Sequence, residues 1–119
     1  MNQNQETIEA DLKGLLDGEV RCDDLFVQIY ASDASIYEVK PLGVVRPRHA
    51  ADVIACVQYA AENQLPVHAR GAGSGLAGES LGRGLIVDFS QYMRRLVSVD
   101  RDTARVQPGL TLAQLNSQL

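Results

Sequence analysis

The stretch PVHARGAGSGLAGES, residues 66–80, decides the fold, because a short apolar run leads directly into a loop that is rich in glycine. Residues 65–69 predict a short strand that the chain enters through Pro66. Glycine permits positive φ and a close approach of the backbone to a ligand, so a glycine-rich loop after a strand is typical of phosphate-binding sites. The stretch therefore predicts a backbone site for an anion. The alternative is a surface turn that binds no ligand.

Two familiar phosphate-binding motifs match the sequence of this loop, but neither structure is physically possible here. Residues 73–78 match the GxGxxG dinucleotide fingerprint, but too few residues precede the next apolar run to form the crossover helix that this fingerprint requires. Residues 73–80 match the Walker pattern, except that Glu79 stands where a lysine neutralises phosphate charge. What remains is a loop that holds an anion with its own N–H groups, with Arg70 at its start and the hydroxyl of Ser74 within it.

Short strands and helices are predicted on both sides of the loop. Before it, residues 44–45 form a very short strand that Pro47 confines to a strand end or an edge, and residues 49–63 carry apolar side chains at helical spacing. After it, residues 85–87 are continuously apolar, which is typical of a strand buried on both faces. The other predicted elements are a helix over 7–17 with Thr7 as N-cap and Gly18 at its end, a helix over 23–30, a β-hairpin of strands 93–99 and 103–106, and a helix capped by Thr111.

Composition places the chain among ordinary globular proteins. Its 119 residues are 45% hydrophobic and 22% charged, and the net charge of −4 with a pI near 5.0 argues against a nucleic-acid partner. No apolar run is long enough for a transmembrane segment, and the polar, acidic N-terminus does not have the pattern of a signal peptide. We therefore expect a cytoplasmic protein, with attachment to a membrane surface only through partner proteins.

Titratable side chains give no pattern for a metal site or for catalysis. Cys22 and Cys56 lie far apart in the sequence and belong to no metal-binding spacing, so we expect two reduced thiols. His49 and His68 have no ligand partners at a usable spacing, and no metal is expected. No acid–base pair or nucleophile–base arrangement is present, so no catalytic residue is expected in this chain. Structural roles are expected for the remaining acidic candidates, Asp33, Glu79 and Asp88.

Four segments, in order, carry a resemblance to a known family: PLGVVRPRHAADV, LPVHARGAGSGLAGES, GLIVDFSQYMRRLVSVD and ARVQPGLTLAQLN. Together they closely resemble the vanillyl-alcohol-oxidase/PCMH-type FAD-binding domain. Within that superfamily the chain is most similar to the FAD-linked 2-hydroxyacid dehydrogenases, the group of the glycolate oxidase D-subunit, D-lactate dehydrogenase and D-2-hydroxyglutarate dehydrogenase. Residues 30–48 resemble the branch whose long chains also carry an iron–sulfur C-terminal region. The resemblance covers residues 20–119, and the glycine loop and the VQPG turn are its most specific parts.

The resemblance implies an α+β (α/β-like) fold, in which a small parallel sheet with flanking helices is followed by a β-hairpin. This is the first subdomain of a PCMH-type FAD-binding domain. Residues 1–30 would be an N-terminal helical extension, and residues 31–119 the FAD-binding subdomain. Because the last predicted helix reaches Leu119 without a stop signal, we expect the chain to be a fragment of a longer oxidoreductase.

The resemblance also implies which residues hold the ADP half of FAD. Many relatives have Gly-Gly-Gly-Thr-Ser where residues 71–75 read GAGSG, and the serine keeps the hydroxyl group. Relatives with a covalent flavin often use a histidine or cysteine in or near this loop. Neither occurs between Arg70 and Leu119, so we expect non-covalent FAD. The implied contacts are Arg70, Gly71, Ala72, Gly73, Ser74 and Gly75 at the pyrophosphate, Leu76, Ala77 and Gly78 toward the flavin, Pro47 on the adenine side, and Pro108 and Gly109 close to the cofactor.

The implied activity is the oxidation of a D-2-hydroxyacid of the glycolate, D-lactate or D-2-hydroxyglutarate class by hydride transfer to the flavin. The groups that bind the substrate and take its proton are expected beyond Leu119, together with any iron–sulfur cluster, so the fragment alone should be inactive. Two alternatives remain open: a PCMH-type flavoenzyme of another substrate class, and a non-catalytic nucleotide-binding module. Exposed apolar surface on the fragment is also expected to favour self-association.

Overall fold

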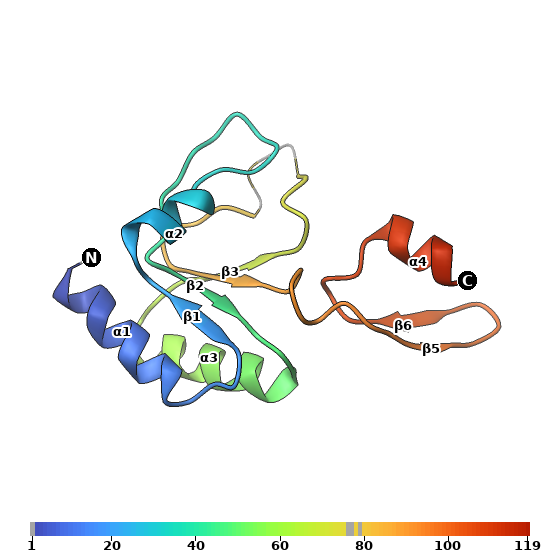
Figure 1. Ribbon diagram of the computed structural model, residues 1–119, viewed down its shortest axis with the longest axis horizontal. Coiled ribbons are helices and arrows are strands. Elements are labelled where there is room, and N and C mark those ends of the chain that lie inside the picture. The colour runs from blue at the N-terminus through green and yellow to red at the C-terminus, as the bar shows by residue number, and fades with distance from the viewer. Residues whose placement is uncertain (1, 76–77, 79) are drawn as a thin grey trace.

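The computed structural model describes residues 2–75, 78 and 80–119, and most of these build a four-stranded sheet with helices on both faces (Figure 1). A separate two-stranded hairpin and a short terminal helix lie to one side of the sheet. In chain order the elements are α1 (Gln3–Lys13), β1 (Glu19–Arg21), α2 (Asp24–Ile29), β2 (Gly43–Arg46), α3 (Ala50–Glu62), β3 (Val67–Arg70), β4 (Leu85–Asp88), β5 (Leu96–Val99), β6 (Ala104–Val106) and α4 (Leu112–Gln118).

Three strands of the sheet are parallel. The order is β1-β2-β4-β3, and β4 pairs in parallel with both β2 and β3. All four residues of β4 are buried, which confirms the expectation of a strand covered on both faces. The expected parallel sheet is therefore present, and β1 extends it as an antiparallel edge strand beyond β2.

The two faces of the sheet carry separate apolar clusters because neighbouring residues of a strand point to opposite faces. Val45 belongs to the larger cluster, under α1 and α3, whereas Val44 belongs to the smaller one, under α2. In β4, Leu85 and Val87 likewise face the larger cluster and Ile86 faces the smaller one. The apolar run that the sequence places in one strand thus serves both sides of the sheet.

The first helix is displaced from the predicted range of 7–17. Asn2, not Thr7, is its N-cap: the Asn2 side chain accepts a hydrogen bond from the Gln5 N–H at 2.8 Å, and the Gln5 side chain accepts one from the Asn2 N–H. The Thr7 hydroxyl instead donates to the Gln3 carbonyl within the helix. The helix ends at Gly14, not at Gly18, because the chain must turn there to enter β1.

β1 is the element that the sequence analysis missed, since three residues are too few to show a periodicity. The chain enters β1 through the turn at Gly18, which lies against the end of β2: a Cβ there would lie 2.3 Å from the carbonyl oxygen of Arg46. Helix α1 and strand β1 share the larger apolar cluster with β2 and β4. The division of the chain at residue 30 remains a prediction, and across it the packing is continuous.

The other predicted elements are confirmed, with small shifts at their ends. Asp23 caps α2 by accepting the Phe26 N–H at 3.2 Å, and α3 covers nearly the whole predicted range. Thr111 caps α4 in a capping box with Gln114. The hairpin of β5 and β6 is present, with its bulge between Leu96 and Ser98. The α+β fold class with a small sheet, flanking helices and a hairpin is therefore confirmed.

The hairpin and α4 add almost nothing to the buried core. No residue of β5, β6 or α4 is buried, and apolar side chains such as Val99 and Leu112 are exposed. We call residues 96–118 the hairpin module. Among the residues that the structure describes, no helix is long and apolar enough to cross a membrane.

The two thiols are held in the larger apolar cluster, which leads to a first prediction. Cys22 and Cys56 are fully buried and free, and burial raises the pKa of each to about 11. At pH 8 we expect both thiols to react with Ellman's reagent about 100-fold more slowly than a free cysteine, because thiolate is the reactive form. In denaturant both should react at the free rate. Fast labelling of the folded chain would contradict this packing.

Candidate functional site

The carboxyl ends of the three parallel strands lie at one edge of the sheet. β2 ends at Arg46 and continues into Pro47, β3 ends at Arg70 and opens into the glycine loop, and β4 ends at Asp88. Open parallel sheets bind their ligands at this edge, where the loops leave the strands. Of the residues predicted for the site, Pro47 and the described part of the glycine loop follow strands at this edge.

Two glycines of the loop have positive φ. Gly73 has φ of +69° and Gly78 has φ of +78°, a region that side-chain-bearing residues rarely adopt. Successive residues with mixed signs of φ turn their N–H groups toward one concave side. Of the predicted contacts, Leu76 and Ala77 lie outside the described residues, as does Glu79.

Arg70 lies behind the loop and not across its mouth. Its guanidinium stacks over the ring of Tyr30, 5.1 Å from the centroid, and its Nη1 donates to the Tyr30 carbonyl at 3.4 Å. A Cβ on Gly73 would lie 2.7 Å from Nη2 of Arg70, so the guanidinium fills the space beside that glycine. The positive charge is thus fixed next to the loop backbone, where it favours a bound anion.

The turn at Pro108 and Gly109 reaches the first residue of the loop. A Cβ on Gly71 would lie 3.8 Å from the carbonyl oxygen of Pro108. Gly109 donates its N–H to the carbonyl of Met93 at 2.8 Å, and a Cβ on Gly109 would lie 2.0 Å from the Phe89 carbonyl oxygen. Only glycine fits this close contact, so the turn is fixed against the end of β4.

Pro47 is placed differently from the loop. It is one of the fully buried residues, and a Cβ on Gly18 would lie 3.1 Å from its Cα. The structure thus encloses Pro47 beneath the turn that enters β1. Its predicted place on the adenine side remains a prediction.

A largely buried polar cluster links the ends of β2 and β4 to Tyr30, the residue after α2, and it was not found from the sequence. The Tyr30 hydroxyl donates to Oδ2 of Asp88 at 2.5 Å and accepts from Nε and Nη2 of Arg46 at 2.9 and 2.7 Å. Burial, together with the bond to Asp88, raises the pKa of Tyr30 to about 12, so the phenol stays protonated. Its members lie far apart in the chain, and no local pattern signals such a cluster. Asp88 has the expected structural role.

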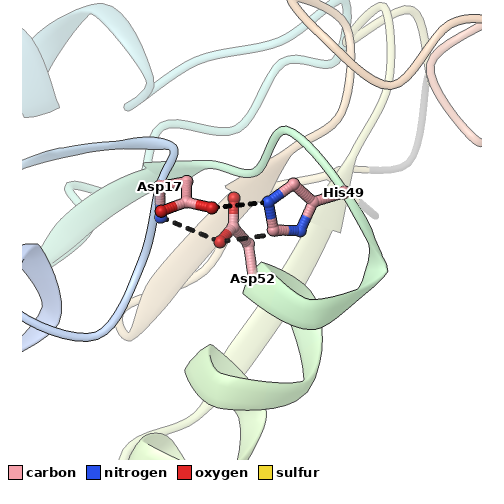
Figure 2. Close-up of side chains that lie close together, drawn as sticks. All are labelled: Asp17, His49 and Asp52. Carbon is pink, nitrogen blue, oxygen red and sulfur yellow. Dashed lines mark hydrogen bonds and ion pairs between the residues drawn. The ribbon is translucent and has the colours of Figure 1, made fainter.

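A second cluster, of Asp17, His49 and Asp52, is shown in Figure 2. The three side chains offer ligand atoms within 4.8 Å of one another. His49 Nε2 lies 2.8 Å from Oδ2 of Asp17, and both side chains are exposed. The long separation of residues 17 and 49 hid this pairing in the sequence analysis.

The contacts of Asp52 show that this cluster holds two segments of the fold together, an arrangement that we call the Asp52 tie. One carboxylate oxygen accepts the N–H of Asp17 at 2.9 Å, and the other accepts those of Gly18 and Arg48 at 3.0 and 2.9 Å. Burial alone would raise the pKa of Asp52, but the three backbone hydrogen bonds and the nearby His49 lower it below the ordinary value. The carboxylate is thus already engaged in joining α3 to the turn before β1.

The fold is that of a small parallel sheet from which a glycine-rich loop opens at the carboxyl ends of the strands. The chain belongs to the family described as FAD binding domain, whose model matches residues 41–119. The family predicted from the sequence is therefore confirmed, and FAD is the cofactor of this family.

Two curated relatives are named D-2-hydroxyglutarate dehydrogenase. That of Pantoea ananatis is 37% identical over 94 residues, which cover 75% of this chain and 9% of the relative. That of Pseudomonas putida is 33% identical over 119 residues, which cover 96% of this chain and 12% of the relative. The chain thus spans about a tenth of the length of these curated relatives.

Solved structures with the same fold include two enzymes of other names. An alkyldihydroxyacetonephosphate synthase matches with a TM-score of 0.78 and 26% identity, over 99% of this chain and 27% of that chain. p-Cresol methylhydroxylase matches with a TM-score of 0.73 and 18% identity, over 99% of this chain and 25% of that chain, which shows a common fold. Both agree with the expected PCMH-type architecture.

Proposed function

We propose that this chain forms the ADP-binding part of the FAD site in a flavin-dependent oxidoreductase that acts on a D-2-hydroxyacid. The observation that carries the proposal is the glycine loop, which has positive φ at Gly73 and Gly78 and opens from β3 at the ligand-binding edge of the sheet. The proposed site residues are the loop, with Arg70 behind it and the Pro108–Gly109 turn beside it.

The proposed fit to a pyrophosphate rests on the loop backbone and on the charge beside it. The space beside Gly73 is filled by the Arg70 guanidinium, which places a positive charge next to this glycine although the whole chain is acidic. Backbone N–H groups supply directed hydrogen bonds, and the guanidinium supplies charge at short range. When bound, the flavin of FAD would accept a hydride from the α-carbon of the substrate.

Non-covalent attachment of FAD is part of the proposal. His68 is the histidine nearest to the loop in sequence, and it lies on β3. A Cβ on Gly82 would lie 2.0 Å from Cδ2 of His68, so the imidazole ring packs against the chain that returns to β4. This packing of the ring supports the proposal of non-covalent FAD.

The substrate class rests on the relatives that bear the name D-2-hydroxyglutarate dehydrogenase. We propose that the groups that bind the hydroxyacid and remove its proton, and any iron–sulfur cluster, belong to the remainder of a longer enzyme. The proposal also includes a reducing, cytoplasmic location, which the two free thiols support. Self-association through the exposed apolar residues of the hairpin module remains a further proposal.

Calorimetric titration of the chain with FAD, ADP, FMN and NAD tests the proposal. We expect FAD and ADP to bind with similar dissociation constants and FMN to bind at least about 10-fold more weakly, because FMN lacks the pyrophosphate bridge and adenosine. FMN binding as tightly as FAD would contradict the placement of the ADP half at the loop. ADP binding without FAD binding would favour a nucleotide-binding module.

A flavoenzyme of another substrate class is the second candidate, because the fold is shared with enzymes whose names denote other reactions. Dye-linked oxidation assays on the longer enzyme, with glycolate, D-lactate and D-2-hydroxyglutarate, distinguish the two. Turnover of none of these hydroxyacids by a flavin-loaded enzyme would favour the second candidate.

A further inference from the structure

We propose that residues 30–37, the clasp segment, hold the glycine loop in its anion-binding shape and that Asp33 is a positioning residue for the cofactor pyrophosphate. The proposal rests on the proposed function of the loop. The clasp segment lies before residue 41, where the match to the FAD binding domain begins. The clasp segment therefore lies outside the residues that match the family, although it contacts the proposed site.

The backbone of the clasp segment orients one peptide group of the loop. The Ala34 N–H donates to the carbonyl of Gly73 at 2.9 Å. The peptide bond between Gly73 and Ser74 is trans and planar, so its N–H points opposite to its carbonyl. Because the carbonyl of Gly73 faces the clasp segment, the N–H of Ser74 points away from it, toward the side that remains for an anion.

Asp33 ties the far end of the loop. Its Oδ2 accepts the hydroxyl of Ser80 at 2.7 Å, and its Oδ1 accepts the N–H of Ser35 at 2.8 Å. Ser80 is buried and Asp33 is half-buried, so this hydrogen bond is partly shielded from water. The hydrogen bonds from Ser35, then that from Ser80 and the charge of Arg70, hold the pKa of Asp33 below its ordinary value, and the side chain acts as a carboxylate.

Two further contacts hold the loop between these ties. At Gly78 an added Cβ would lie 2.9 Å from Cδ2 of Tyr37 and 3.6 Å from Oγ of Ser35, so the clasp segment packs directly on that glycine. At the start of the loop, the Tyr30 ring and carbonyl hold the Arg70 guanidinium. The clasp segment therefore contacts the loop at its beginning, middle and end.

The clasp segment is itself closed by short-range bonds. The Val39 N–H donates to the Ala31 carbonyl at 2.7 Å, and Ser32 and Glu38 form an isolated antiparallel bridge. A glycine-rich loop loses much conformational entropy when it is ordered. A fixed neighbour that orders the loop in advance reduces the entropy lost when a ligand binds, and so raises affinity.

Asp33→Ala tests the proposal in the 119-residue chain. Titration with FAD and with ADP should show dissociation constants about 10-fold higher than wild type for both ligands, with unchanged stoichiometry. Ser80→Ala should weaken binding to a lesser extent, and adding it to Asp33→Ala should weaken binding little further, because the two residues share one bond. Asp33→Asn should restore affinity to within about threefold, because the amide can still accept from Ser35 and pair with Ser80.

The matched control is Asp102→Asn, which removes an exposed charge in the turn between β5 and β6 and should leave both affinities unchanged. Loss of affinity through general unfolding would instead lower the binding stoichiometry and would not be rescued by asparagine. Binding by Asp33→Ala within twofold of wild type would overturn the proposal.

Hydrogen exchange of the free chain separates this proposal from the proposed function. We expect Asp33→Ala to speed exchange of the Ala34 amide, which donates to the Gly73 carbonyl, about 10-fold or more, while the amides of β4 keep their wild-type rates. If wild type binds neither FAD nor ADP, the proposed function fails, and this exchange measurement still decides the role of the clasp segment. Unchanged exchange of the Ala34 amide would overturn it.

Discussion

Gly73→Asp should raise the dissociation constant for FAD by about 100-fold or more. Gly73 has φ of +69°, and a side chain there meets the Arg70 guanidinium at 2.7 Å. A carboxylate would neutralise the guanidinium charge and repel the pyrophosphate, and at a separation of about 4 Å such a repulsion amounts to several kcal/mol in the partly shielded edge of a protein. Fluorescence quenching of FAD on binding measures the change.

Gly73→Asn separates charge from shape in this test. Asparagine tolerates positive φ better than most residues and has nearly the volume of aspartate without its charge. We expect it to weaken FAD binding by about 10-fold or less, since the end of the flexible Arg70 side chain can move aside. If the asparagine and aspartate variants lost affinity equally, the charge argument for Arg70 would be wrong.

Asp52→Ala should destabilise the chain by about 3 kcal/mol, because three backbone N–H groups lose a buried charged acceptor. For a chain of this size the change corresponds to a fall of the melting temperature of about 10 °C or more. Thermal unfolding followed by circular dichroism measures it. Asp17→Asn is the matched control, because it removes only the exposed side-chain pair with His49 and should cost less than about 1 kcal/mol.

The pH dependence of the free energy of unfolding is a second test of the hydrogen bonds to Asp52. Because the pKa of Asp52 is lowered in the folded chain, its contribution is fully present above the unfolded pKa of 3.8 and is lost as pH falls through the lower folded value. Wild type should therefore lose stability below about pH 4 more steeply than Asp52→Asn, which has no carboxylate to protonate at this position. Equal slopes for the two chains between pH 5 and 3 would rule out the tie as a source of acid sensitivity.

The fold was predictable where the sequence carries a local signal. The apolar run of β4, the helical spacing of α3 and the Thr111 cap all mark their elements within a few residues. β1 could not be found in this way, because its three residues form a strand only through pairing with β2. The start of α1 was predicted too late, because asparagine and glutamine at its end form a capping box that apolar periodicity does not reveal.

The candidate site was likewise predictable only where a local sequence pattern marks it. Glycine spacing predicted the loop, and the positive φ of Gly73 and Gly78 agrees with the physical reason for those glycines. The placement of Arg70 behind the loop depends on Tyr30, which lies forty residues earlier in the chain, and no local pattern links the two. The tie at Asp52 likewise joins segments that meet only after the sheet has formed. Contacts between distant segments are what the sequence alone did not provide.

The hairpin module has a consequence for how this domain can change over evolutionary time. Its strands and helix bury none of their residues, whereas the sheet and its covering helices contain the core. Substitutions on these strands and this helix, outside the turn at Pro108 and Gly109, therefore alter what the domain touches while leaving the stability of the sheet nearly unchanged. Sheet and module can diverge at different rates, and a lineage can reshape the surface of the module without first acquiring a more stable core.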